Sequence, residues 1–334
     1  MDLIALLNDA VAKIPSGDHS QGLNAIVRHV NNAIRHIERD QNLDPDSCTD
    51  AIYRTNQAYE GSLKEAYRVL AGKDPSGLSP FQIEGYLESN NTVRPRVLTQ
   101  LTRYRKDYRN PSAHDYKLDF DNDEALLAIV SVCGFAILLL NQIRSKIEST
   151  AAQARVAVNT LVNNNTSTLS NAEKVAAICL AYTRESTNVD WYEYERGIAE
   201  SLVAYGYNAD VQFDENNDDL NENTLWDVIV RDNDYVIGID SRLSRRYRTD
   251  LKPMTMVGYD TTLSHDNFNA AVITVRSSKD TDYRLYHAAK APYPLYIICD
   301  PADTDQLTLS EESLGTLTDV SSLAEQLGVS HTTK

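Results

Sequence analysis

Closely spaced cysteines are absent from this sequence. Its four cysteines lie far apart, none belongs to a CxxC motif, and Cys133 and Cys299 sit inside apolar runs. Thiols in such surroundings are typically buried and free. The spacing argues against a disulfide framework and against a zinc site. We therefore expect reduced thiols, a cytoplasmic protein, and no metal or other cofactor.

The sequence also lacks a clear signal peptide and a full-length membrane span. No N-terminal segment combines a basic flank, an apolar core and a small-residue cleavage site. The longest apolar run covers 125–140 and is interrupted by Ser131 and Gly134. This run is shorter than the ~18–20 residues that a span needs. We interpret it as a helix buried on nearly all sides, in a core or a subunit interface, and expect no membrane partner.

An excess of basic residues is missing as well. The net charge is −16; residues 1–150 hold 17 basic and 20 acidic residues, and residues 151–334 hold 15 and 28. This balance argues against a general nucleic-acid coat protein. It leaves a nuclease open, because a local basic patch suffices to hold one substrate strand.

The length of 334 residues predicts two domains, since one hydrophobic core rarely grows that large. Residues 1–148 read as helical almost throughout. Residues 149–170 read as a helical extension followed by a linker, because 163–168 are Asn, Thr and Ser only. Residues 171–334 alternate between helical and strand patterns. We expect an all-α bundle followed by an α/β domain.

Apolar periodicity and capping signals place the helices of the first half. Ser79, Pro80 and Gln82 form a helix start with a capping box, and Asp123 is a plausible N-cap for the apolar helix. The predicted helices cover about 3–14, 23–37, 47–71, 95–108 and 124–147, and a further helix begins at Pro80.

The second half predicts a mixed sheet flanked by helices. Two helices come first, at about 171–186 and 190–205, and a third is expected around 279–290. The predicted strands cover 209–213, 225–230, 235–240, 270–276 and 293–299.

The most informative stretch is 108–114, Tyr-Arg-Asn-Pro-Ser-Ala-His. Pro111 removes a backbone donor and pushes the residue before it out of helical geometry. We therefore expect the helix to end here, with Arg109 in its last turn and His114 on the bend that follows. Both side chains then point at one place.

An arginine and a histidine at one place suit metal-independent RNA cleavage. In this reaction a 2′-hydroxyl attacks its own phosphate, which requires a proton acceptor and a cation. Histidine supplies the first and arginine the second, while Asn110 orients one of them. A structural alternative also exists, with Arg109 paired to an acid and His114 capping a helix. Nearby residues add a positive surface for stacking bases: Arg103, Tyr104, Arg105 and Lys106.

The order of elements carries a family resemblance. A helical hairpin, then R-N-x-x-A-H, then a very apolar helix closely resembles the HEPN superfamily of ribonucleases over about residues 20–147. That family's motif is an arginine, a polar residue, a short spacer and a histidine, which Arg109, Asn110 and His114 match. The resemblance implies a homodimer, in which two protomers pack through their helices and bring two motifs into one composite cleft.

The extension His114-Asp115-Tyr116 also resembles the HEPN toxins whose tyrosine is adenylylated by an antitoxin. The resemblance implies a modification at Tyr116 and an antitoxin or defence partner. Because the chain has 19 tyrosines, a packed or exposed tyrosine without such a role is the alternative.

The helix 190–205 carries a carboxylate beside its apolar stripe. Asp190 is the expected N-cap, and Glu195 falls at the edge of the stripe, facing inward. The stripe itself is formed by Trp191, Tyr194, Ile198 and Leu202.

Two further acids follow in the predicted strands, Asp227 in 225–230 and Asp240 at the end of 235–240. Together with Glu195 they resemble the restriction-endonuclease-like fold and its D…(D/E)-x-K signature. In that family carboxylates hold Mg²⁺ and a lysine orients the water. Here Arg242 stands where the lysine would be, and arginine cannot act as that lysine does. The resemblance therefore implies a degenerate domain used for binding or dimerisation.

A basic cluster follows these acids, formed by Arg242, Arg245, Arg246 and Arg248. It suits a nucleic acid or a phosphorylated ligand, or it pairs with the many acids nearby.

We therefore expect a metal-independent endoribonuclease that acts as a toxic effector in antiphage defence or a toxin–antitoxin system. The second domain would serve as a sensor or recognition module, by analogy alone. One rival is a Mg²⁺-dependent DNA endonuclease that uses Glu195, Asp227 and Asp240, with the helical half as dimeriser. Another is a non-catalytic dimeric scaffold.

Overall fold

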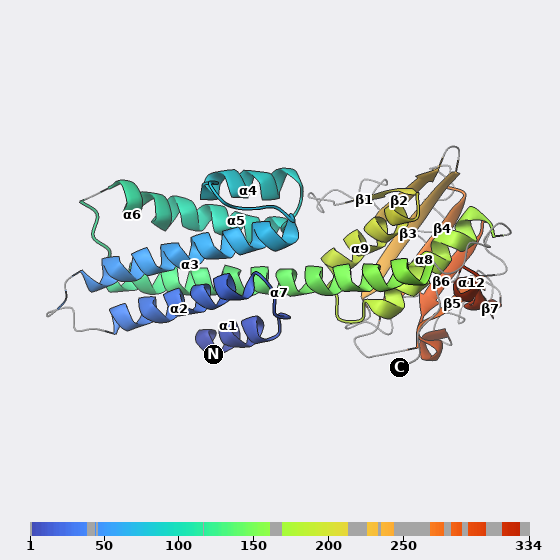
Figure 1. Ribbon diagram of the computed structural model, residues 1–334, viewed down its shortest axis with the longest axis horizontal. Helices are drawn as coiled ribbons and strands as arrows, with labels where there is room; N and C mark the ends of the chain where they lie inside the picture. The colour runs from blue at the N-terminus through green and yellow to red at the C-terminus, as the bar shows by residue number, and fades with distance from the viewer. Residues whose placement is uncertain are drawn as a thin grey trace. The chain divides into compact units, whose positions relative to one another are not determined.

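The computed structural model describes residues 2–38, 44, 46–115, 117–160, 169–212, 226–232, 235–243, 268–276, 282–288, 293–304 and 316–327. The chain divides into two compact units, Met1–Ile147 and Glu148–Lys334. The first is helical and the second holds a mixed sheet, which confirms the predicted order of classes (Figure 1). Each unit is described by itself below.

The helical unit follows the apolar periodicity of the sequence closely. Its helices are α1 (Leu3–Ala12), α2 (Ser20–Ile37), α3 (Ser47–Leu70), α4 (Pro80–Ser89), α5 (Pro95–Tyr104), the π-helix η1 (Arg105–Arg109), α6 (Asn110–His114) and α7 (Asn122–Thr160). Their apolar faces share one core. The predicted capping box of α4 is present: Ser79 Oγ accepts from the Gln82 amide, and Gln82 Oε1 accepts from the Ser79 amide.

The start of α7 differs from the prediction. Asp121, and not Asp123, caps the helix, because its Oδ1 accepts from the Glu124 amide at 2.9 Å. Glu124 Oε2 in turn accepts from the Asp121 amide at 3.1 Å. This reciprocal pair is a capping box, and the Asp-x-x-Glu spacing that forms it is readable in the sequence.

Helix α7 is much longer than the apolar run predicts. Over Asn122–Val156 it is long and apolar enough to cross a membrane by length and composition alone, and 56% of its most apolar window is buried within the protein. Ala128 and Leu139 lie in the core of the helical unit, whereas Ala152 and Val156 lie in a core of the second unit. One helix thus supplies both cores.

In the second unit, the described residues form one sheet of seven strands in the order β1-β2-β3-β4-β6-β5-β7. Strands β3 and β6 run parallel to β4, and the other pairs are antiparallel. The strands are β1 (Asn208–Val211), β2 (Val228–Asp232), β3 (Tyr235–Leu243), β4 (Ala270–Arg276), β5 (Arg284–Ala288), β6 (Leu295–Cys299) and β7 (Leu317–Asp319). Every residue of β4 is buried, as expected of a central parallel strand.

Three helices and a short turn accompany the sheet. They are α8 (Asn171–Glu185), α9 (Trp191–Ala204), α12 (Ser322–Gln326) and the 3₁₀ turn η2 (Pro301–Asp303). Side chains of α8 and α9 share a core with one face of the sheet, and a smaller core lies on the other face. The predicted N-cap of α9 is confirmed, since Asp190 Oδ1 accepts from the amides of Tyr192 and Glu193.

The helix predicted around 279–290 is wrong. Its described part is strand β5, which pairs with both β6 and β7. Leu285 packs into the core beneath α8, whereas Tyr286 packs on the opposite face of the sheet. Pairing on both edges and burial on both faces outweigh the local helical pattern. The predicted linker at 163–168 lies outside the described residues.

Candidate functional site

The motif segment 105–114 is helical throughout, which corrects the predicted bend. In η1 the Asn110 amide bonds to the Arg105 carbonyl, five residues back. Pro111 then occupies the first turn of α6, where no backbone donor is needed. The π turn therefore accommodates the proline without ending the helix. Such turns are common at functional sites.

The continuous helix changes the geometry of the two motif side chains. Arg109 and His114 are five residues apart, and at 3.6 residues per turn this places them about 140° apart around the helix axis. The two side chains therefore leave the helix on different sides.

Arg109 is held by an acid on α3. Its Nε donates to Glu60 Oε1 at 3.2 Å, and the two side chains are 27% and 33% exposed. Arg109 Nη1 lies 3.5 Å from Asn110 Oδ1, at the long limit of a hydrogen bond. The structural alternative for Arg109, a paired acid, is thus present. The guanidinium is still partly open to solvent.

His114 is the last residue of α6 and is exposed. The segment before it is anchored on α3, because Asn56 Nδ2 donates to Ser112 Oγ at 2.7 Å. Tyr53 adds a second anchor, its hydroxyl donating to the Ser112 carbonyl at 3.3 Å. The predicted modification site Tyr116 lies outside the described residues.

Sequence reasoning missed Tyr53, Asn56 and Glu60. Their spacing of three and four residues puts them on one side of α3, next to the motif. Polar residues at helical spacing beside an apolar stripe were the available signal. The local sequence gives no indication of which motif residue each of these three side chains contacts.

Two of the four residues predicted to bind RNA have structural roles instead. Tyr104 is 2% exposed, and its hydroxyl donates to Thr55 Oγ1 at 2.7 Å, so its ring cannot stack on a base. Arg105 Nε donates to the buried Glu84 at 2.8 Å. Arg103 and Lys106 remain exposed. The positive surface beside the motif is therefore smaller than predicted.

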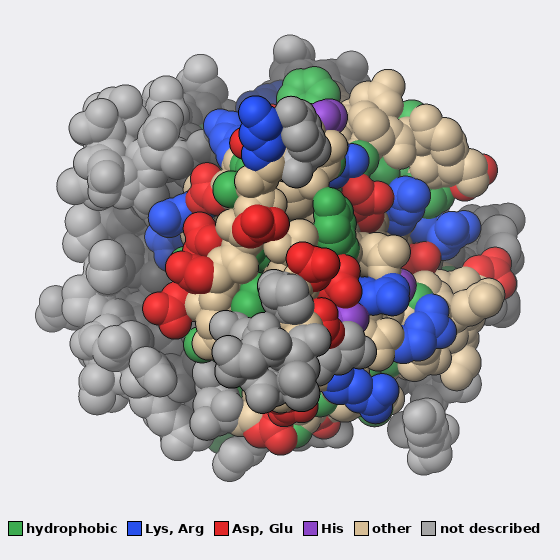
Figure 2. All heavy atoms as spheres, turned by 90° about the vertical axis from the view of Figure 1, so that its left-hand side faces the viewer, with side chains coloured by type: hydrophobic (Ala, Val, Ile, Leu, Met, Phe, Trp, Pro, Cys, Tyr) green, Lys and Arg blue, Asp and Glu red, His purple; other side chains and the backbone are tan. Residues whose placement is uncertain are grey.

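Acidic and basic side chains occupy different areas of the face shown in Figure 2. Acidic side chains lie mainly at the centre and left of this view, and most Lys and Arg side chains lie toward the right. A local group of cations thus exists on a strongly acidic chain.

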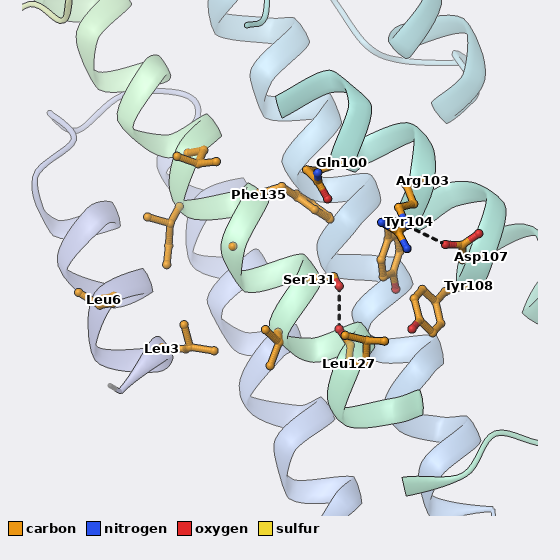
Figure 3. A pocket seen from close by; sticks show the side chains of 14 residues that line it. Leu3, Leu6, Gln100, Arg103, Tyr104, Asp107, Tyr108, Leu127, Ser131 and Phe135 are labelled. Carbon is orange, nitrogen blue, oxygen red and sulfur yellow. Dashed lines mark hydrogen bonds and ion pairs between the residues drawn. The ribbon is translucent and has the colours of Figure 1, made fainter. Parts of the chain in front are cut away.

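An apolar groove of about 620 Å³ runs along α7 in the helical unit. Ser131 and Phe135 of α7 line it (Figure 3), and so does Gly134, which has no side chain to fill the space. Leu3 and Leu6 of α1 form one wall, and residues of α5 and η1 form the other. Three α7 residues at its edges are 43–57% exposed: Leu127, Val130 and Leu138.

In the second unit, Ser241 joins two of the three predicted carboxylates. Its Oγ donates to Glu195 Oε1 at 2.9 Å and its amide donates to Asp227 Oδ2 at 2.6 Å. Burial raises the pKa of Glu195 to about 8, and the negative charge of Asp227 adds to the shift. The expectation that Glu195 faces inward is confirmed. Trp191, however, is 44% exposed and does not belong to the apolar stripe.

Asp240 points to the opposite face of β3 from Ser241, although its negative charge also helps to raise the pKa of Glu195. Ile237 and Ile239 pack into the core shared with α8 and α9, whereas Gly238 faces Trp226 on the other side. Side chains alternate along a strand, so Ser241 lies on the helix side and Asp240 on the other. Across the described ranges, no three His, Cys, Asp or Glu side chains gather closely enough to hold a metal ion.

The basic cluster cannot be placed around these acids. The backbone of Arg242 belongs to β3. Arg245, Arg246 and Arg248 lie outside the described residues.

No family model, curated protein or solved structure matches this chain. The HEPN and restriction-endonuclease resemblances therefore rest on the motif residues and the order of elements. Functional argument has to come from the two sites themselves.

Proposed function

We propose that this protein is a metal-independent endoribonuclease of the HEPN type. The observation that carries the proposal is the presence of a partly exposed arginine and an exposed histidine within one continuous helical segment that contains a π turn. Arg109 keeps guanidinium surface for a phosphate, and His114 is accessible to substrate. A helical unit with a very apolar final helix around this motif supports the same function.

The chemistry assigns a separate role to each side chain. His114 takes the proton of the 2′-hydroxyl as that oxygen attacks the adjacent phosphate. Arg109 stabilises the charge that grows on the phosphate oxygens. The bond from phosphorus to the 5′-oxygen breaks, that oxygen takes a proton from water, and His114 releases the proton it accepted to solvent. The products carry a 2′,3′-cyclic phosphate and a 5′-hydroxyl. Asn110 holds the guanidinium through its amide oxygen.

The reaction requires two protomers in this proposal. The two motif side chains diverge around the helix, so Arg109 of one copy works with the histidine of another in a composite cleft. The exposed apolar edge of α7 and the groove beside it supply a surface for such pairing. Burying Leu127, Val130 and Leu138 against the same surface of a second copy gives an isologous interface.

The second unit acts as a sensing or recognition module, and the whole protein acts as a toxic effector in antiphage defence or a toxin–antitoxin system. Among the described residues no three carboxylate, His or Cys side chains gather closely enough for a metal, and an arginine stands at position 242; both observations support binding over catalysis there. This assignment rests on analogy with effector–sensor architectures.

Expression in a bacterial host tests the function directly. Wild-type protein should degrade cellular RNA and arrest growth, and His114→Ala should do neither at equal protein level. Intact RNA with the wild type, or equal damage by the variant, would reject the proposal.

A second candidate is a Mg²⁺-dependent DNA endonuclease centred on Glu195 and Asp227. Their proximity, which contributes to the raised pKa of Glu195, favours it, because a cation would relieve the repulsion. Plasmid nicking by His114→Ala protein in Mg²⁺ or Mn²⁺ separates the candidates. Nicking that Asp240→Ala abolishes would favour the DNA endonuclease, while EDTA should leave the RNA activity intact. A scaffold without catalysis would show neither activity.

A further inference from the structure

Helix α3 forms a polar strip beside the motif that the ribonuclease proposal does not yet use. Tyr53, Gln57 and Glu60 are spaced by four and three residues, so they share one side of the helix. Tyr53 is 49% exposed, and Gln57 is exposed as well. Two members of the strip contact the motif segment, Tyr53 through Ser112 and Glu60 through Arg109.

The ring of Tyr53 is fixed in place but open on its surface. Its hydroxyl donates to the Ser112 carbonyl at 3.3 Å, which ties the ring to α6. A tyrosine with a bonded hydroxyl and an exposed ring offers apolar area at low entropic cost. Arg54, the next residue, adds a cation and donates to Gln57 Oε1 at 3.0 Å. An aromatic ring next to a cation is the arrangement that stacks single-stranded bases.

Glu60 fixes the orientation of the arginine. It accepts from Nε, on the inner edge of the guanidinium, at 3.2 Å. A carboxylate on this edge holds the planar group still and leaves the terminal nitrogens to a phosphate, apart from the one Nη1 hydrogen that faces Asn110 Oδ1 at 3.5 Å. The negative charge of Glu60 also weakens the attraction between this site and RNA. Glu60 therefore contributes by positioning the guanidinium of Arg109 and not by attracting RNA.

We propose that this strip of α3 is the binding wall for an unpaired nucleotide. Tyr53 stacks on the base, and Glu60 is a positioning residue that aims Arg109 at the adjacent phosphate. This inference rests on the proposed ribonuclease function and adds its substrate class. A base that stacks on Tyr53 must first leave its own stack, so the substrate is single-stranded RNA or an unpaired loop.

Binding in a His114→Ala background tests the role of Tyr53 without requiring cleavage. The probe is a short fluorescent single-stranded oligouridine, compared with the same strand in a duplex. Adding Tyr53→Ala should weaken single-strand binding about tenfold or more, and Tyr53→Phe should stay within about twofold of the parent. Phe81→Ala, which removes an aromatic side chain 66% exposed on α4, is the matched control and should change nothing.

Three binding results would overturn the stacking role. These are unchanged affinity with Tyr53→Ala, an equal loss with Tyr53→Phe, and tighter binding of the duplex than of the single strand. If the wild type does not cleave RNA but Tyr53→Ala weakens binding, the ribonuclease proposal is rejected and the binding wall is kept. If the wild type cleaves RNA but Tyr53→Ala leaves binding unchanged, the binding wall is rejected and the ribonuclease proposal is kept.

Cleavage rates test the role of Glu60. Glu60→Ala should lower kcat about tenfold or more while RNA binding in the His114→Ala background stays equal or tightens. Glu60→Gln should recover most of the rate, because its amide oxygen still accepts from Arg109 Nε. Faster cleavage by Glu60→Ala would make Glu60 a competitor of the phosphate and overturn the positioning role. A Glu60→Gln variant as slow as Glu60→Ala would also overturn it.

Discussion

Arg109 and His114 meet different surroundings on one short helix. Arg109 is tied to Glu60 and 27% exposed, while His114 sits open at the end of α6. A cation held by an acid suits a fixed electrostatic role, and an open imidazole suits proton transfer. A substitution of Arg109 should therefore remove a phosphate contact, and a substitution of His114 should remove the proton acceptor.

Arg109→Ala should lose cleavage and also weaken RNA binding by roughly tenfold, because a charge-assisted phosphate contact is lost. Arg109→Lys should recover binding better than rate, since an ammonium lacks the planar fork. Binding is measured in the His114→Ala background and rate in the active protein. Arg68→Ala, at a side chain 42% exposed near the C-terminal end of α3 and outside the predicted RNA surface, is the control and should change binding far less. Full activity of Arg109→Ala would remove the arginine from the mechanism.

Glu195 gives the second unit a predicted pH dependence. Its pKa is raised from 4.5 to about 8 in the folded protein by burial first and Asp227 second. Between pH 4.5 and about 8 the folded state therefore binds more protons than the unfolded state, and the stability of the second unit falls as the pH rises through this range. Glu195→Gln should equal the wild type below pH 4.5 and exceed it by up to about 5 kcal/mol above pH 8.

Urea denaturation followed by tryptophan fluorescence measures this effect. The two tryptophans of the chain, Trp191 and Trp226, both belong to the second unit, so the signal reports that unit alone. A stability difference that stays constant across the pH window would show that charge at Glu195 is not its cause.

At the scale of elements, prediction succeeded where a pattern is local. The helices of the first unit follow apolar periodicity, and Ser79, Pro80 and Gln82 announce the start of α4 as the structure has it. Prediction failed where distant segments determine the secondary structure, as in β5, which forms a strand because it pairs with β6 and β7. Pro111 misled for another reason, since a π turn lets the helix pass a proline that would otherwise end it.

The candidate site was predicted only in part. Arg109, Asn110 and His114 stand in one short motif, so spacing alone reveals them. Asn56 contacts Ser112 from 56 residues away, and Glu60 contacts Arg109 from 49 residues away. Such pairs arise from the packing of α3 on α6, which a single sequence does not encode as a readable pattern. Burial removed Tyr104 from the RNA surface for the same reason.

Strand β3 permits a direct test of its packing. A Cβ on Gly238 would lie 2.2–2.5 Å from ring atoms of the buried Trp226. Gly238→Ala should destabilise the second unit by about 1–3 kcal/mol, the usual cost of overpacking. Gly85→Ala in α4, where a Cβ meets nothing within 4 Å, should instead stabilise the helical unit by about 0.5–1 kcal/mol, because alanine favours the helix. Tryptophan fluorescence follows urea unfolding of the second unit for Gly238→Ala, and far-ultraviolet circular dichroism follows the helical unit for Gly85→Ala. An unaltered midpoint for Gly238→Ala would contradict the packing of β3.

The proposed composite cleft of the whole molecule depends on the pairing of two chains. Leu127 and Leu138 are 57% and 46% exposed on a helix whose other face fills the core. A large exposed apolar patch is typical of an interaction surface. The angular separation of Arg109 and His114 gives a second and independent reason to expect a dimer.

The double variant Leu127→Asp/Leu138→Asp should convert a dimer into a monomer, because two charges would enter each side of the interface. Its helicity should stay unchanged, since both side chains are exposed within the protomer. Val203→Asp, at a residue 53% exposed in the second unit, should remain dimeric. Light scattering at micromolar concentration measures the mass. A monomeric wild type would remove the composite cleft.

The most direct test of the central claim is the chemistry of the RNA ends. Purified wild-type protein is incubated with RNA in EDTA, and the cleavage products are analysed for their termini. We expect cleavage that EDTA does not affect, products ending in a 2′,3′-cyclic phosphate, and no cleavage by His114→Ala. Loss of activity in EDTA, absence of the cyclic phosphate, or an undiminished rate for His114→Ala would contradict the account.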